Sequence, residues 1–287
     1  MQKIVPFLWF DKEAREAAEF YTSVFDHSGI LSSTMIRNTP SGDTEVIEFQ
    51  ILGYYFKAIS AGPYFKINPS ISFHVRCRTL DEADRIWSKL SPGGLVMMDF
   101  GEYPFSKRYG WIQDKFGVSW QVIHTEGEFG QFILPALMFV GKVCGMAEEA
   151  IKLYTSVFHH TSSEILARYG KGEEPDKDGS VRYAQFFLET QEFSAMDSAL
   201  NHDFSFNEAV SFVVNCRDQK EIDDFWNRLS ALPEAEQCGW IKDKYGVSWQ
   251  IVPANMGELL ARNPEKTTPV MLGMKKIIIA DLEQAGA

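Results

Sequence analysis

Basic runs, cysteine motifs and long apolar segments are all scarce in this chain of 287 residues. Lys and Arg number 28 against 39 Asp and Glu, which gives a formal net charge of −11. Without a Lys/Arg-rich run the sequence lacks the positive surface that a phosphate backbone needs, so we expect no nucleic-acid partner. The apolar start, MQKIVPFLWF, is interrupted by Asp11 and Glu13 before a secretory signal or a membrane span could form. We therefore predict a cytoplasmic protein that does not bind membranes.

The four cysteines stand alone, at positions 77, 144, 216 and 238. They form no CxxC motif, and their spacing is not that of a zinc site or a disulfide framework. Cys77 and Cys216 each end an apolar, strand-like run, where a thiol behaves as a small buried hydrophobe. We expect reduced, structural thiols.

What the chain does contain is an internal repeat. GWIQDKFGVSWQVIH, from Gly110, returns as GWIKDKYGVSWQIVP, from Gly239, with ten of the fifteen positions identical. Two more pairs occur in the same order: FYTSVF at 20 with LYTSVF at 153, and ISFHVRC at 71 with VSFVVNC at 210. A chain of this length with 45% hydrophobic residues can build two domains, each with its own core. We predict a first domain over residues 1–126, a second over 132–254 and a C-terminal helical tail over 255–287.

Each copy shows the same order of elements twice. An apolar strand such as IVPFLWF is followed by a stretch with helical spacing, such as DKEAREAAEFYTSVF, and then by three strand-like runs. Copy 1 also keeps a hairpin, between Gly93 and Tyr109, that copy 2 has trimmed. The chain therefore has an α+β pattern of four βαβββ modules, with helices covering one face of mostly antiparallel sheets and the other face free to curl.

Four segments carry a family resemblance: PFLWFDKEAREAAEFYTSVF, the paired DK[FY]GVSWQ motif, FNEAVSFVVNCRDQKEIDDFWNRL and the closing MKKIIIADLEQA. With them the chain resembles, over nearly its whole length, the PhnB-like branch of the vicinal oxygen chelate superfamily, also called the glyoxalase/bleomycin resistance/dioxygenase fold. The resemblance implies two tandem glyoxalase-like domains, each a cup-shaped sheet made of paired βαβββ modules with helices on the outer face. Single-copy members often form homodimers, so this chain resembles a dimer fused into one polypeptide, and a further homodimer stays open.

Some members of this branch carry the label 3-demethylubiquinone-9 3-methyltransferase. We find no support for that activity in the sequence. No strand, glycine-rich turn and helix able to hold S-adenosylmethionine is evident, so we predict no cofactor.

Metal-dependent relatives bind one divalent ion inside the cup, through His, His and Glu on the first, fifth and last strands. Carried over by motif, these positions fall on Pro6, Ser70 and Gln121 in copy 1, and on Pro135, Ala209 and Gln250 in copy 2. None of the six is His, Asp or Glu, and a neutral Gln oxygen adds no charge to hold a cation. The resemblance therefore implies no metal here.

The same positions indicate which side chains face the cup, because alternate residues of a strand share a face. The expected ligand-binding residues are Leu8, Phe10, Ser72, His74, Ser119 and Gln121 in copy 1, and Leu137, Phe139, Ser211, Ser248 and Gln250 in copy 2. An apolar cup with a few neutral polar groups suits a small organic molecule.

Trp120 and Trp249 have the opposite phase and should face the helices, with Trp87 and Trp226 as neighbours. Asp114 and Asp243 are interpreted as turn residues.

His74 is the one ionisable group in this set that could act as a base near neutral pH. Val213 takes its place in copy 2, and the sequence shows no carboxylate that would orient the imidazole. We therefore assign no catalytic residue beyond this one candidate. The alternative is a strand histidine that bonds to a neighbouring hydroxyl or to water.

These observations favour a metal-free protein that binds a small molecule, with copy 1 as the functional cup because it keeps His74 and the longer hairpin. A metal-dependent lyase, isomerase or dioxygenase is one alternative, and it would need ligands elsewhere, such as Glu45, Glu48, Asp197 or Glu208. A structural or regulatory module whose cups are filled by their own side chains is another. Whether the chain is an enzyme stays open at this stage.

Overall fold

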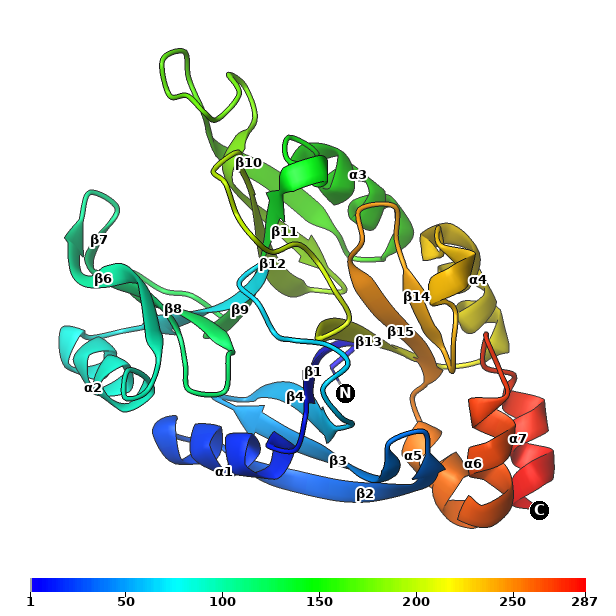
Figure 1. The fold of residues 1–287 in the computed structure, drawn as a ribbon. Coiled ribbons are helices and arrows are strands. Elements are labelled where there is room, and N and C mark those ends of the chain that lie inside the picture. Colours follow the sequence, from blue (N-terminus) through cyan, green and yellow to red (C-terminus); the bar gives the residue numbers. More distant parts are fainter. Residues whose placement is uncertain (1) are drawn as a thin grey trace.

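The strands form two curled sheets, and each sheet combines strands from both repeats (Figure 1). The computed structural model describes residues 2–287. The seven-stranded sheet has the order β14 (Trp240–Lys242), β15 (Ser248–Pro253), β13 (Val210–Cys216), β1 (Ile4–Phe10), β4 (Tyr54–Ser60), β3 (Gly42–Ile51) and β2 (Gly29–Thr39). The eight-stranded sheet has the order β10 (Ser162–Arg168), β11 (Val181–Leu188), β12 (Gln191–Ser198), β9 (Ile133–Val140), β5 (Ile71–Cys77), β8 (Ser119–His124), β7 (Ser106–Gln113) and β6 (Leu95–Tyr103).

Near the centre of each sheet, one antiparallel pair of strands joins the two repeats. Strand β1 pairs with β13, where Val5 lies opposite Val213. Strand β5 pairs with β9, where His74 lies opposite Leu134. The outer modules of the chain therefore share the seven-stranded sheet, and the two inner modules share the eight-stranded sheet. The α+β fold class is confirmed, but the grouping of cup residues copy by copy is wrong, because each cup takes strands from both copies.

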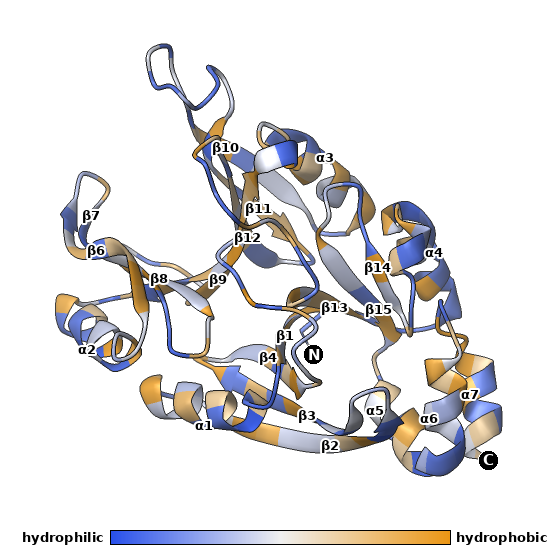
Figure 2. Cartoon of the chain, viewed as in Figure 1, coloured by the Kyte–Doolittle hydropathy of each residue, from blue (hydrophilic) through white to orange (hydrophobic). Residues whose placement is uncertain are grey.

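Four helices cover the sheets on one side: α1 (Ala14–Val24), α2 (Leu80–Leu90), α3 (Ala147–Val157) and α4 (Gln219–Leu229). Figure 2 shows hydrophilic and hydrophobic sides on the same helix, as expected for helices that pack on a sheet. The side chains of Thr79 and Asp218 accept hydrogen bonds from backbone amides in the first turns of α2 and α4, which fixes where these helices begin. Helices α1 and α4 contact the seven-stranded sheet, whereas α2 and α3 contact the eight-stranded sheet.

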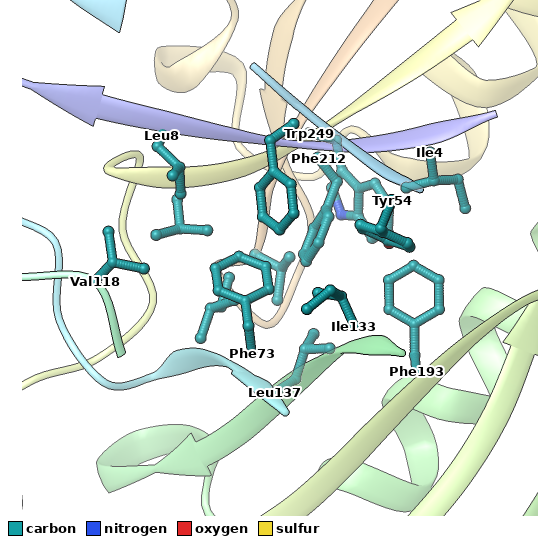
Figure 3. Packing of buried hydrophobic residues seen from close by; sticks show 14 of the residues in the cluster. Ile4, Leu8, Tyr54, Phe73, Val118, Ile133, Leu137, Phe193, Phe212 and Trp249 are labelled. Atoms are coloured by element: carbon teal, nitrogen blue, oxygen red, sulfur yellow. The ribbon is translucent and has the colours of Figure 1, made fainter. Parts of the chain in front are cut away.

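The core lies between the helices and the two sheets. Figure 3 shows its centre, where Leu8 of β1 and Phe212 of β13 lie near Phe73 of β5 and Leu137 of β9. All four side chains are buried. The opposite face of each sheet, which we call the cup face, points away from this core.

The trimmed hairpin expected in copy 2 is confirmed. Strands β6 and β7 form a long hairpin, whereas the matching part of copy 2 contains the short 3-10 turn Pro233–Ala235 and the three-residue strand β14. A second 3-10 turn, Gly141–Val143, follows β9. The backbone of the C-terminal segment lies along the edge beside β14. The amides of Cys238 and Gly239 donate to the carbonyls of Met274 and Lys275, at 2.8 and 2.7 Å.

The C-terminal segment forms three helices, α5 (Met256–Arg262), α6 (Pro264–Leu272) and α7 (Ile279–Gly286), drawn in orange to red in Figure 1. They pack on the cup face of the seven-stranded sheet. The contact forms a second apolar cluster, separate from the main core. It joins the strand residues Val5, Phe7, Ile59, Val213 and Val252 to the helix and tail residues Leu259, Leu260, Met271, Ile277 and Leu282. Among residues 2–287 no helix is both long enough and apolar enough to span a bilayer.

Candidate functional site

The repeated DK[FY]GVSWQ motif closes a turn and fixes a tryptophan. Asp114 accepts hydrogen bonds from the backbone amides of Phe116 and Val118, at 2.8 and 3.0 Å, and from the indole N–H of Trp120, at 2.8 Å. Asp243 repeats this pattern with Tyr245, Val247 and Trp249. Burial raises the pKa of both carboxyl groups, while these donors act to lower it. The aspartates are therefore turn residues.

Both tryptophans of the motif face the helices, as predicted. Trp120 packs against Tyr21 and Phe25 at the end of α1, with ring centroids 5.2 and 5.5 Å away. Trp249 packs in the same way against Tyr154 and Phe158.

The predicted pairing of Trp120 with Trp87 is wrong. Trp87 stacks instead on Phe100 of the long hairpin, with ring centroids 4.6 Å apart. The two rings lie against Gly110, where an added Cβ would come within 2.7 Å of Trp87. A side chain at position 110 would therefore collide with the stacked pair.

The glutamine that follows each tryptophan faces the cup. Gln121 accepts a hydrogen bond from the Tyr109 hydroxyl, at 2.7 Å, and donates one to the Ser72 hydroxyl, at 2.8 Å. Gln250 donates to Ser211 at 2.9 Å. The amide of Gln121 is thus held between strands β7 and β5, and its oxygen is already used.

His74 lies beside this network on the cup face of the eight-stranded sheet. Its side chain is buried, with 6% of the residue exposed, and its Nε2 has no hydrogen-bond partner among the described residues. Burial, together with the charge of Arg76, lowers the pKa of His74 to about 3. A neutral imidazole with so low a pKa is a poor general base at neutral pH, which argues against the proposed catalytic role.

The rings of His74 and Tyr183 meet across the cup, with centroids 6.2 Å apart and an interplanar angle of 25°. Strands β9 and β12 lie between their two strands in the sheet. The sheet therefore curls strongly enough for side chains from β5 and β11 to touch over the two strands that separate them.

Four of the eleven predicted ligand-binding residues do not face a cup. Leu8, Phe10, Leu137 and Phe139 belong to the main core on the helix side of the sheets, so their predicted orientation is wrong. The cup-face residues of β1 are Val5, Phe7 and Trp9, one position out of phase. A shift of one residue turns every side chain of a strand to the other face.

The other seven predicted residues lie on the cup faces but belong to two different cups. Ser72, His74, Ser119 and Gln121 meet on β5 and β8 of the eight-stranded sheet. Ser211, Ser248 and Gln250 meet on β13 and β15 of the seven-stranded sheet.

The two cups differ most at equivalent positions on their floors. In the seven-stranded sheet, Phe7 lies opposite Lys57, which forms an ion pair with Glu48. The eight-stranded sheet has Ala136 opposite Ser194 at the same place, and Gln185 beside them. One floor is therefore bulky and charged, while the other is made of small or neutral side chains.

The residues of the eight-stranded cup that the sequence did not reveal are Tyr109, Tyr183, Ser194, Arg76 and Glu192. Arg76 forms a two-pronged ion pair with Glu192, and both side chains are buried. The Ser194 hydroxyl is buried and unbonded within residues 2–287. Glu192, Ser194 and Tyr183 come from copy 2, so they could be found only once the modules were known to pair across the repeats.

A groove of about 830 Å³ adjoins this cup at Gln113 of β7, which neighbours Ser119. Two loops, one before β5 and one before β13, form its floor. They are joined by reciprocal bonds from Asn68 to the carbonyl of Ser205 and from Asn207 to the carbonyl of Lys66. Apolar lining residues of the groove, Ile67, Pro69, Leu95, Met97 and Phe204, are mixed with polar and charged ones, among them Lys66, Gln113, His202 and Asp203.

The residues at the usual metal positions do not fit a divalent cation. The oxygen of Gln121 already accepts from Tyr109, and its neighbour Ser72 is neutral. In the described part of the chain no three His, Cys, Asp or Glu side chains gather in a way that could hold a metal. The four acids named as alternative ligands have other partners: Glu45 pairs with Arg15, Glu48 with Lys57, Glu208 with Lys242, and Asp197 accepts from backbone amides.

Curled sheets made of repeated βαβββ modules, with a cup on one side and helices on the other, define the vicinal oxygen chelate superfamily fold. The chain belongs to the family described as 3-demethylubiquinone-9 3-methyltransferase, whose model matches residues 2–123 and again 131–252. The double match confirms the tandem duplication.

Solved structures are also similar to this chain. The PhnB protein from Bacillus cereus is 39% identical to this chain, covers 43% of it and matches over 100% of its own length, with a TM-score of 0.40. Glyoxalase I from Zea mays is 14% identical and has a TM-score of 0.56, with 89% of this chain and 93% of that chain covered. The second likeness concerns the fold alone. No curated protein matches the sequence significantly.

Proposed function

We propose that the chain binds one small organic molecule, without a metal ion, in the cup of the eight-stranded sheet. The observation that supports this most directly is the Nε2 atom of His74, buried and unbonded within residues 2–287. Buried polar groups in proteins nearly always have a partner, and a ligand group can supply it. The side chains of Ala136 and Ser194 on the floor of the cup are small, and a groove of about 830 Å³ lies next to the cup at Gln113.

The seven-stranded cup has a structural role in this proposal. Phe7 and Lys57 occupy its floor, and helices α5–α7 cover it with buried side chains such as Leu259 and Leu282. The alternative of a cup filled by its own side chains therefore fits the seven-stranded sheet. We expect one ligand per chain.

The proposal is for binding and not for methyl transfer. S-adenosylmethionine carries a sulfonium, an ammonium and a carboxylate group, and each needs a counter-charge or a strong hydrogen bond when buried. On the cup face of the central strands of the eight-stranded sheet, the charged residues that the structure describes are Arg76 and Glu192, and they neutralise each other.

A substitution that copies the seven-stranded cup provides the test. Ala136→Phe places in the eight-stranded cup the side chain found at Phe7, and Ala254→Phe, at an exposed position, is its control. Metabolite mixtures would be screened by native mass spectrometry and thermal shift against wild type and both variants. We expect one ligand per chain in wild type and Ala254→Phe, and none in Ala136→Phe.

The melting temperature of Ala136→Phe distinguishes a cup with room for a ligand from a cup that is filled by its own side chains. If the cup has room, the melting temperature changes little. If the cup is already packed, overpacking costs about 1–3 kcal/mol or more and lowers the melting temperature clearly. Such a loss, together with no ligand in any screen, would refute the proposal.

A further inference from the structure

The cup of the eight-stranded sheet is electrically neutral at its centre. On strands β12, β9, β5 and β8, the described cup-face residues that can ionise are His74, Arg76 and Glu192. Arg76 and Glu192 share two hydrogen bonds, of 2.7 and 2.5 Å. His74 is held in its neutral form by burial, which lowers its pKa. A charged ligand group would lose its hydration there without gaining a counter-ion.

Three aromatic residues on the same face are held by hydrogen bonds or by stacking. The hydroxyl of Tyr109 is bound to Gln121, and the indole N–H of Trp111 donates to Ser119 at 2.7 Å. Tyr183 stacks on the His74 ring. Because these rings are held at their polar ends or by stacking, their orientations are defined. Planar aromatic molecules pack well against rings held in this way.

The polar groups that remain can satisfy a small neutral group. Nε2 of His74 and the hydroxyl of Ser194 have no partner in the part of the chain that the structure describes. The Ser72 hydroxyl accepts from Gln121, so its proton is free to be donated. Each of these groups can bond an amide, hydroxyl or carbonyl group.

We propose that the ligand of the eight-stranded cup is an uncharged aromatic molecule that bears an amide, hydroxyl or carbonyl group. This inference rests on the proposed binding function. The neutral cup selects against charge, the rings select for planarity, and His74, Ser72 and Ser194 bind the polar group.

Three probes with one ring system and three charges test the inference. They are 2-naphthamide, which is neutral, 2-naphthoate, an anion, and 2-naphthylmethylammonium, a cation. Dissociation constants at pH 7.5 would be measured by isothermal titration calorimetry or by ligand-observed NMR. We expect the amide to bind at least tenfold more tightly than either ion. We also expect His74→Val, which introduces the residue found at Val213, to weaken amide binding about tenfold, as loss of one hydrogen bond predicts.

The Ala136→Phe variant keeps failure of this inference distinct from failure of the binding function. If an ion binds as tightly as the amide and Ala136→Phe abolishes both, the cup binds ligands but the inference about charge is refuted. If the amide binds equally well to Ala136→Phe, it lies elsewhere, and the inference is refuted. If no probe binds to wild type although metabolite screening yields a ligand in the cup, the aromatic class is refuted. If neither yields a ligand, the binding function itself fails.

Discussion

Replacing Asp114 by Asn should destabilise the protein by about 2–4 kcal/mol, because one oxygen of this buried side chain would become a donor. In the structure Oδ1 accepts from the amides of Phe116 and Val118, and Oδ2 accepts from the indole of Trp120. An asparagine can keep the first two bonds through its oxygen. Its NH₂ group then faces the indole N–H, which is buried and can only donate.

The magnitude follows from the two losses. A hydrogen bond to a charged group contributes about 1.5–3 kcal/mol, and a buried donor left without a partner costs about 1–3 kcal/mol. The two terms overlap, since both describe the same indole, so their sum is an upper limit. For a chain of this size we expect the melting temperature to fall by roughly 2 °C per kcal/mol, or about 4–8 °C.

Urea unfolding, followed by tryptophan fluorescence and circular dichroism, would measure the change. Asp178→Asn, at an exposed position in the loop between β10 and β11, is the matched control and should stay within about 0.5 kcal/mol of wild type. If Asp114→Asn is as stable as this control, the carboxylate does not hold Trp120, and our account of the repeated motif is wrong.

Three further outcomes are expected. Leu282→Ala should cost about 2–5 kcal/mol, because this tail residue is fully buried against the seven-stranded sheet, whereas exposed Leu200→Ala should be nearly neutral in the same urea titration. The depressed pKa of His74 means that the unfolded chain binds the extra proton first, so stability present above pH 6.5 is lost as pH falls toward 3. Between pH 7.5 and 5, wild type should lose about 2 kcal/mol more than His74→Val, and equal losses would show that His74 is not buried as a neutral group. A protease site inserted at residues 127–130 should be cut without separating the halves on size exclusion, because both sheets use strands from each half; release of folded halves would contradict this pairing.

Much of the fold was predictable because the repeated segments carry clear periodicity. The order of strand and helix, the trimmed hairpin and the helix-facing tryptophans all follow from pattern and spacing. Which side chains of β1 and β9 point to the core could not be predicted, because IVPFLWF and ILPALMFV are apolar throughout and are buried on both faces. A strand without alternation gives no signal for its phase, so one misplaced position reversed Leu8 and Phe10.

Pairing of modules across the repeats was also beyond the sequence. Strands β1 and β5 both bury apolar side chains in the core, and either could pair with β9 or β13 in a sheet of the same type. Only the three-dimensional arrangement places Ser194 and Tyr183 of copy 2 in the same cup as His74 of copy 1. Half of the candidate site was therefore hidden until the partner strands were known.

The C-terminal helices on the seven-stranded sheet show what fusion of two copies into one chain permits. In a symmetric homodimer every substitution enters both cups at once, so a residue that fills one cup also fills the other. In a fused chain a substitution can change one cup and leave the other unchanged. One cup can exchange small residues for Phe7 and Lys57 and accept a helical cover, while the other keeps Ala136 and Ser194. The duplication thus frees one site from the constraints of the other.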